Sequence, residues 1–214
     1  MYFTNRYEAA QELAAHLTKY KSSSTLVLAI PRGGVPIGCV LAKTLQAPLD
    51  LLMAKKIGYP GDPEYAIGAV CENEIFVDPH SGVDSGYIAQ EQKKIQQELK
   101  VRYKILSVCD RPLSLRKKKV ILTDDGIATG RTMLVAVQAA RKQDPAELIV
   151  AVPVCSLAAR ERLEPAVDTL ISCYYPDPFI GVGRFYRQFE QVTDQAVRAM
   201  LSAVELSNTP NSTT

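Results

Sequence analysis

Short apolar runs rich in β-branched residues alternate with segments of helical period along most of this chain. These runs cover residues 25–30, 49–54, 119–123, 148–152 and 167–171. A strand reads as a continuous apolar run when helices cover both faces of its sheet. The alternation therefore predicts an α/β fold with a doubly wound, mostly parallel sheet.

Helical periodicity and turn residues predict how the rest of the chain is organised. Helices are expected over residues 35–45, 86–108 and 132–141, from residue 194 onward, and near the amino terminus with Asn5 as the N-cap. Glycine and proline punctuate residues 57–86 around two strand-like runs, 67–71 and 75–77, which predicts an excursion from the sheet. A chain of 214 residues suits one domain. We expect it to cover residues 1–206, with 57–86 as a lid, 1–20 and 174–206 as flanking segments, and 207–214 as a disordered tail.

Composition excludes several other classes of protein. Lysine and arginine total 25 and aspartate and glutamate 23, and this net charge of +2 does not predict a nucleic acid or membrane partner. The chain has no apolar run of about 18 residues and no secretory signal at its start, so a cytoplasmic protein is expected. Its five cysteines form no CxxC pair and are expected to be reduced and structural.

One segment, residues 120–132, combines groups with a clear chemical use. A buried strand runs into Asp124 and Asp125, and a Gly/Thr-rich turn then opens a helix. Unpaired N–H groups at a helix start, beside the carboxyl end of a parallel strand, bind anions. Thr129 can add a hydroxyl, and Gly130 can adopt positive φ close to a phosphate. Because the two carboxylates would repel that phosphate, they should serve sugar hydroxyls or a metal, and the segment predicts a sugar phosphate site.

The same segment has a purely structural alternative. Asp124, Asp125 and Gly126 could form a plain acidic turn, with Thr129 as an ordinary N-cap. Side chains alternate along a strand, so both acids can face one ligand only if the strand ends there and the backbone turns. The complete order of strand, acid pair and Thr-Gly-x-Thr favours the functional interpretation.

Two further groups of residues follow predicted strands on the same sheet edge. Arg32, Gly33 and Gly34 come directly after the first strand, where glycines let the main chain wrap an anion and arginine supplies a forked donor. Lys55 and Lys56 follow the second. The alternatives are a tight turn with a solvated arginine and a solvated lysine loop. The glycine spacing fits neither G-x-G-x-x-G nor the Walker motif.

Residues Val120–Thr132 closely resemble the phosphoribosyl pyrophosphate (PRPP) signature of type I phosphoribosyltransferases. The resemblance implies that the catalytic carboxylates Asp124 and Asp125 contact the ribose hydroxyls. It implies a 5′-phosphate loop formed by Ala128, Thr129, Gly130, Arg131 and Thr132, and a pyrophosphate site formed by Arg32, Gly33, Gly34, Lys55 and Lys56. A Rossmann-like or flavodoxin-like core, a non-proline cis peptide near Arg32, a small hood and a flexible lid are also implied, as is Mg²⁺ held by PRPP alone or also by Asp124 through water.

Two other stretches bear on the resemblance. Residues 174–186 are similar to a hood segment that meets the base in purine-using members, which makes Asp177, Val182 and Phe185 candidate base contacts; ordinary packing is the alternative. The lid departs from the family pattern, because no lysine or arginine lies between Lys56 and Lys93. Neutralisation of the pyrophosphate then falls to Mg²⁺ and the lysine pair.

The resemblance implies a magnesium-dependent glycosyltransferase of nucleotide salvage, in which phosphoribosyl passes from PRPP to a nitrogenous acceptor, a nucleobase, and pyrophosphate is released. A homodimer is expected. The alternative is a non-catalytic PRPP or nucleotide sensor on the same fold, which the lid without basic residues favours slightly. A flavodoxin-like interaction domain is a third reading.

Overall fold

The main sheet has five parallel strands in the order β2-β1-β6-β7-β8. The computed structural model describes residues 3–71, 74–108 and 112–208. The five strands are β1 (Thr25–Ala29), β2 (Leu49–Leu51), β6 (Lys119–Thr123), β7 (Glu147–Val154) and β8 (Thr169–Tyr174). Their parallel pairing confirms the predicted doubly wound α/β class and brings the carboxyl ends of β1 and β6 side by side.

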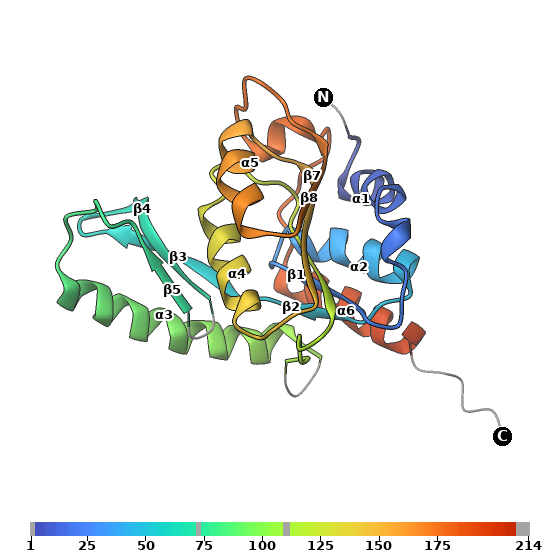
Figure 1. The fold of residues 1–214 in the computed structure, drawn as a ribbon, viewed down its shortest axis with the longest axis horizontal. Coiled ribbons are helices and arrows are strands. Elements are labelled where there is room, and N and C mark those ends of the chain that lie inside the picture. Colours follow the sequence, from blue (N-terminus) through green and yellow to red (C-terminus); the bar gives the residue numbers. More distant parts are fainter. Residues whose placement is uncertain (1–2, 72–73, 109–111, 209–214) are drawn as a thin grey trace.

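Helices cover both faces of this sheet (Figure 1). The helices of the described residues are α1 (Arg6–Ala15), α2 (Gly34–Leu45), α3 (Ser85–Leu106), α4 (Arg131–Arg141), α5 (Leu157–Leu163) and α6 (Asp194–Asn208), with the short helices η1 (Thr18–Tyr20), η2 (Glu164–Ala166) and η3 (Val182–Phe185). Alternate residues of one strand enter different cores. Ile121 packs with α1 and α2, whereas Leu122 packs with α4 and α5.

A second, antiparallel sheet lies beside the main one (Figure 1). It consists of β3 (Ala54–Tyr59), β4 (Asp62–Cys71) and β5 (Glu74–Val77), and we call it the small sheet. Pro60 and Gly61 form the two-residue connection of β3 to β4, and Gly61 adopts the positive φ of 84° that suits glycine. Ile57 and Ile67 pack against Ile95 and Leu99 of α3 in a third core. The segment predicted as a lid excursion is thus largely an ordered sheet.

Several element boundaries differ from the sequence predictions. The second strand was expected to reach residue 54, but β2 ends at Leu51 and the chain then enters the small sheet. Lys55 and Lys56 accordingly lie within β3 rather than in a loop. The short helix α5 was not predicted, whereas the N-cap was: the Asn5 side chain accepts from the N–H groups of Tyr7 and Glu8.

The carboxyl-terminal helix and the cysteines can also be compared with the sequence predictions. Helix α6 runs to Asn208, two residues into the predicted tail, and residues 209–214 lie outside the described residues. Cys39, Cys71, Cys155 and Cys173 are free thiols, as expected, and Cys109 lies outside the described residues. Among residues 3–71, 74–108 and 112–208, no helix has both the length and the apolar character needed to cross a membrane.

Candidate functional site

The two adjacent acids lie in a turn immediately after β6, which we call the acid-pair turn (residues 124–126). The strand ends at Thr123, as the sequence argument required, and the N–H of Asp125 donates to Asp124 Oδ1 at 2.8 Å. Gly126 is needed here, because a Cβ at this position would lie 2.6 Å from a Val154 methyl carbon and 2.7 Å from one of Val182. Glycine thus allows the chain to turn close to Val154 of β7 and Val182 of η3.

Electrostatics in the acid-pair turn disfavour two full negative charges. Burial raises the pKa of Asp124 well above its usual range, and the neighbouring charge of Asp125 adds to this. Burial also raises the pKa of Asp125, although the Arg6 guanidinium opposes that effect. Carboxylates with perturbed pKa values in such a position are typical of functional sites.

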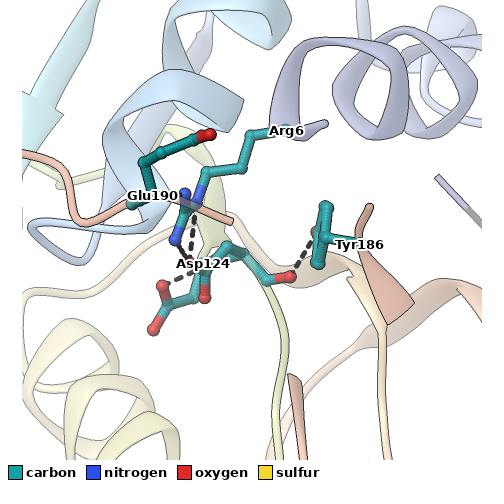
Figure 2. Close-up of polar contacts among 5 residues, drawn as sticks. Arg6, Asp124, Tyr186 and Glu190 are labelled. Atoms are coloured by element: carbon teal, nitrogen blue, oxygen red, sulfur yellow. Dashed lines mark hydrogen bonds and ion pairs between the residues drawn. The ribbon is translucent and has the colours of Figure 1, made fainter. Parts of the chain in front are cut away.

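Arg6, which the sequence analysis did not single out, holds Asp125 from the first turn of α1. Its Nε and Nη2 atoms donate to Asp125 Oδ2 at 2.9 and 2.7 Å, and only 12% and 14% of the two side chains are exposed. Figure 2 shows Arg6 extending from its helix to this turn, with Tyr186 and Glu190 nearby. One of the two candidate ribose ligands is therefore already paired with an arginine.

The surroundings of Arg6 come from the carboxyl-terminal part of the chain. Its guanidinium lies over the Phe189 ring at 3.9 Å and donates to the Glu190 carbonyl at 2.9 Å. Tyr186 stacks on Phe189 with ring centroids 5.0 Å apart and donates its hydroxyl to the Asp125 carbonyl at 2.6 Å. A single basic residue on an amino-terminal helix carries no sequence signal for these contacts, because its partners are about 120 to 180 residues away.

The predicted phosphate loop (residues 128–132) leads into α4. Gly130 adopts φ 74° and is itself the N-cap, so the alternative in which the Thr129 side chain caps the helix is wrong. Ala128 and Thr129 are exposed, and Thr132 is half-buried. Arg131 points to the small sheet, where it donates to the Ala66 carbonyl and pairs with Asp78 at 3.8 Å. The loop is thereby connected to both sheets.

Two residues that the sequence analysis missed fix the carbonyl groups of this loop. The Ser156 hydroxyl donates to the Ala128 carbonyl, and Arg162 donates to that of Thr129. These two hydrogen bonds fix the orientation of the loop, and the first N–H groups of any helix have no acceptor within the helix and can bind an anion. A cavity of about 460 Å³ lies beside the loop, and Ala128, Thr129 and Asp177 are among its lining residues.

The predicted pyrophosphate loop (residues 31–34) packs directly against the acid-pair turn. The peptide bond between Pro31 and Arg32 is cis, as the resemblance implied. A Cβ at Gly33 would lie 2.1 Å from Asp125 Oδ2, and one at Gly34 would lie 2.7 Å from the Thr123 carbonyl oxygen. Both glycines are therefore required for the close approach of this loop to the end of β6.

Basic side chains near this loop come from three different elements. Arg32, Lys55 and Arg102 of α3 are among the residues lining a cavity of about 640 Å³. Lys55 pairs with Glu98. Lys56 is not among the described residues that line this cavity, because successive side chains of β3 point to opposite faces of the small sheet.

The three candidate base contacts have different surroundings. Asp177 is exposed beside the phosphate loop, and Val182 of η3 lies against Gly126. Phe185 is only 7% exposed and packs on Phe179 with ring centroids 5.1 Å apart. The structure thus places Phe185 in the core. Asp177 lies beside the phosphate loop, and Val182 lies beside the acid-pair turn.

The acid pair also supplies the donors that suit a hard cation. Mg²⁺ is commonly bound by one or two carboxylates together with phosphate oxygens and water. Arg6 neutralises Asp125, so Asp124 is the better carboxylate for such an ion. In the part of the chain that the structure describes, no group of three or more His, Cys, Asp or Glu residues could hold a metal alone. These residues therefore fit an ion that arrives with a phosphorylated ligand.

Comparisons with known proteins find one family and several similar proteins. A family model described as phosphoribosyl transferase domain matches residues 3–184. The Mycobacterium tuberculosis protein named "Putative phosphoribosyl transferase MT0597" is 34% identical over 204 residues, which cover 93% of this chain and 46% of that protein. The chain thus spans about half the length of this curated relative. The crystal structure of TT1426 from Thermus thermophilus superposes with a TM-score of 0.81 at 34% identity, covering 94% of this chain and 98% of that one.

Proposed function

Because the chain belongs to the phosphoribosyl transferase family, we propose that it transfers the 5-phosphoribosyl group from PRPP to a nitrogenous acceptor and releases pyrophosphate. The observation that carries this proposal is the meeting of three segments at one sheet edge. The pyrophosphate loop, the acid-pair turn and the phosphate loop all follow the ends of β1 and β6, which pair in parallel. Gly33 touches Asp125, which brings the first two segments into direct contact.

Each segment has a distinct part in binding PRPP. The N–H groups around Gly130 at the start of α4 receive the 5′-phosphate, because the first N–H groups of a helix have no acceptor within the helix and lie at the positive end of its dipole. Asp124 and Asp125 accept from the ribose hydroxyls. Arg32 and the main chain at Gly33 and Gly34 hold the pyrophosphate, with Lys55 at the edge of the same cavity.

Catalysis in this arrangement is electrostatic. Cleavage of the bond at ribose C1 places positive charge on the sugar and negative charge on the departing pyrophosphate. The carboxylates of Asp124 and Asp125 lie where they stabilise the sugar, and Arg32 and Lys55 lie where they stabilise the leaving group. Bound Mg²⁺, with Asp124 as a ligand directly or through water, would neutralise further phosphate charge. The proposed acceptor, a nucleobase, then enters beside Asp177 and Val182.

A second candidate function is a non-catalytic PRPP sensor. The pairing of Asp125 with Arg6 favours it, because a carboxylate already bound by an arginine has less freedom to respond to a developing charge. The same family membership accommodates both functions. A homodimer, a cytoplasmic location, a role in nucleotide salvage and lid closure stay predictions.

Pyrophosphate release decides between the two functions. PRPP and Mg²⁺ are titrated calorimetrically, and release is then measured across a panel of nucleobases. An enzyme binds PRPP and releases pyrophosphate with at least one base, whereas PRPP binding without release supports the sensor. Absence of PRPP binding contradicts both.

The variant Asp125→Asn tests the central role of the acid pair. We expect its turnover to fall by at least about tenfold, since loss of one transition-state interaction usually costs more than about 1.4 kcal/mol. Asp144→Asn is the matched control, because Asp144 is exposed and pairs with Arg116 and Lys117 away from the site. A smaller fall in Asp125→Asn, with PRPP affinity intact, contradicts the assigned role.

A further inference from the structure

Three cationic side chains face the cavity beside the pyrophosphate loop, and one of them has no role yet. Arg32 follows β1, Lys55 lies in β3, and Arg102 lies in the last third of α3. The remaining wall is largely apolar and includes Met53, Ala54, Leu99, Val101 and Ile105.

Arg32 and Arg102 are brought together by one carboxylate oxygen. Asp194, in the first turn of α6, accepts from Arg102 at 2.8 Å and from Arg32 at 3.4 Å, both on Oδ1. Two guanidinium groups that share one oxygen atom lie within reach of a single small anion. Lys55 has a similar internal partner in Glu98, one helical turn before Arg102 on α3.

Charge and exposure indicate that these ion pairs can be replaced by a ligand. Three cations share two carboxylates, so the cluster keeps a positive surplus. The side chains of Arg32, Lys55, Arg102, Glu98 and Asp194 are 33%, 51%, 42%, 43% and 41% exposed, and ion pairs this exposed contribute little stability. A diphosphate offers each guanidinium two oxygens in the bidentate geometry that arginine prefers, whereas Asp194 offers both groups the same single oxygen.

We propose that Arg102 is a third cationic residue of the pyrophosphate site, and that Asp194 and Glu98 act as internal counter-ions which the diphosphate displaces. This inference rests on the proposed function and adds to it a residue outside the segments that carry the PRPP resemblance. It also explains how the pyrophosphate charge is neutralised although the lid segment (residues 57–86) contains no lysine or arginine. The long helix after the lid, α3, supplies the additional cation. Binding of the diphosphate then loosens the contact of α3 and α6 at Asp194.

Calorimetric titration of inorganic pyrophosphate with Mg²⁺ tests the proposal in four proteins. Relative to wild type, we expect Arg102→Gln to bind pyrophosphate about tenfold more weakly or worse, since it loses charge-assisted hydrogen bonds. Asp194→Asn should bind it several-fold more tightly, because a competing carboxylate is gone. Lys104→Gln is the matched control: Lys104 is exposed on the same helix, does not line this cavity, and its loss changes the net charge equally. Its affinity should be unchanged.

Ribose 5-phosphate, which carries no diphosphate, separates this inference from the proposed function. Wild type and Arg102→Gln should bind it equally. If wild type binds both ligands but Arg102→Gln and Lys104→Gln bind pyrophosphate alike, or if Asp194→Asn binds it more weakly, the role of Arg102 is overturned and the proposed function stands. If wild type binds neither ligand, both fall. Should Arg102→Gln not fold, Arg102→Lys and Asp194→Asn give the same decision.

Discussion

Asp124 and Asp125 place two carboxylates side by side in partial burial, and among the described residues an arginine pairs with Asp125 but not with Asp124. Such a pair is poorly stabilised until hydrogen-bond donors arrive from outside the protein. Ribose hydroxyls and magnesium-bound water are donors of that kind. The acid pair therefore weakens the empty fold and strengthens the attraction for a ligand, as expected of residues selected for binding.

Replacement of Asp124 by asparagine should stabilise the protein at neutral pH. Burial raises the pKa of this carboxyl in the folded state. The stability of the fold is therefore highest below the unfolded-state pKa, where the carboxyl is neutral in both states, and it falls as pH rises through the folded-state pKa. The asparagine side chain has no charge to bury and keeps an acceptor for the Asp125 N–H. We expect the melting temperature of Asp124→Asn to exceed that of wild type by a few degrees at pH 7, where 1 kcal/mol corresponds to about 2–4 °C.

The pH dependence of this difference supplies the control. The advantage of Asp124→Asn should shrink as pH falls toward the ordinary range for aspartate and vanish below it, when the wild-type acid is neutral in both states. Asp168 behaves in the opposite way, since its hydrogen bond with Arg141 lowers its pKa. Asp168→Asn should therefore be less stable than wild type at pH 7. A constant difference for Asp124→Asn at every pH contradicts the assigned cause.

Loss of Arg6 should be much more costly than loss of an exposed arginine. Arg6→Gln leaves Asp125 largely buried without its cation, and removal of one partner of such a pair costs about 3 kcal/mol or more. The double variant with Asp125→Asn should recover a large part of this loss. Urea unfolding of the two single variants and the double variant measures the coupling, and Arg187→Gln, at an exposed neighbouring position, is the control. Additive effects would show that the two side chains do not interact.

At the scale of elements, the pyrophosphate loop and the end of β6 fit together only because two glycines lie between them. Gly34 is the more restrictive, since the atoms that a Cβ would meet are backbone atoms: the Thr123 oxygen at 2.7 Å and the Asp124 Cα at 2.9 Å. Backbone atoms of a central strand cannot shift independently of the sheet. The start of α2 is thus fixed relative to the acid-pair turn.

Gly34→Ala should accordingly affect both stability and binding. Overpacking of this kind costs about 1–3 kcal/mol, and the loop must move away from the acid-pair turn to relieve it. We expect a lower urea midpoint together with weaker pyrophosphate binding. Both are measured on the same preparation. An unchanged midpoint would contradict this prediction, because it would mean that the loop can accommodate the added methyl group.

Local signals were sufficient to predict most elements. The apolar run of β6 matches residues 119–123, and Asn5 caps α1 as its side chain suggested. The exit of the chain from the main sheet after Leu51 was missed, because an apolar run does not show which sheet receives it. Arg6 and Arg102 were missed for a related reason: their partners lie 119 and 92 residues away, and only tertiary packing brings them together.

At the scale of the whole molecule, three cores join two sheets of different character. β6 and β7 are covered by helices on both sides, whereas all four residues of β5 are only half-buried. The small sheet is held by α3 and by the contacts of Arg131 with Ala66 and Asp78. Regions with less buried backbone open locally at a lower free energy than is needed to unfold the whole protein.

Hydrogen exchange should show this difference directly. The amides of β1, β6 and β7 should exchange most slowly, and those of β4 and β5 should exchange through smaller openings. Arg131→Ala should speed exchange in the small sheet and leave β7 and β8 unchanged, because it removes a connection of the phosphate loop to β4. Equal acceleration in both sheets would contradict the assignment of Arg131 as a link between them.

The contact of Arg6 with Glu190 spans 184 residues and closes over the acid pair. Arg6 is synthesised well before Phe189 and Glu190. A nascent polypeptide can therefore assemble β1, β6 and both anion-binding loops while Asp125 still lacks the complete surroundings of its arginine. The surroundings of Arg6 are therefore completed only after residues 189 and 190 have been synthesised, and a chain truncated before Phe189 should not form these two contacts.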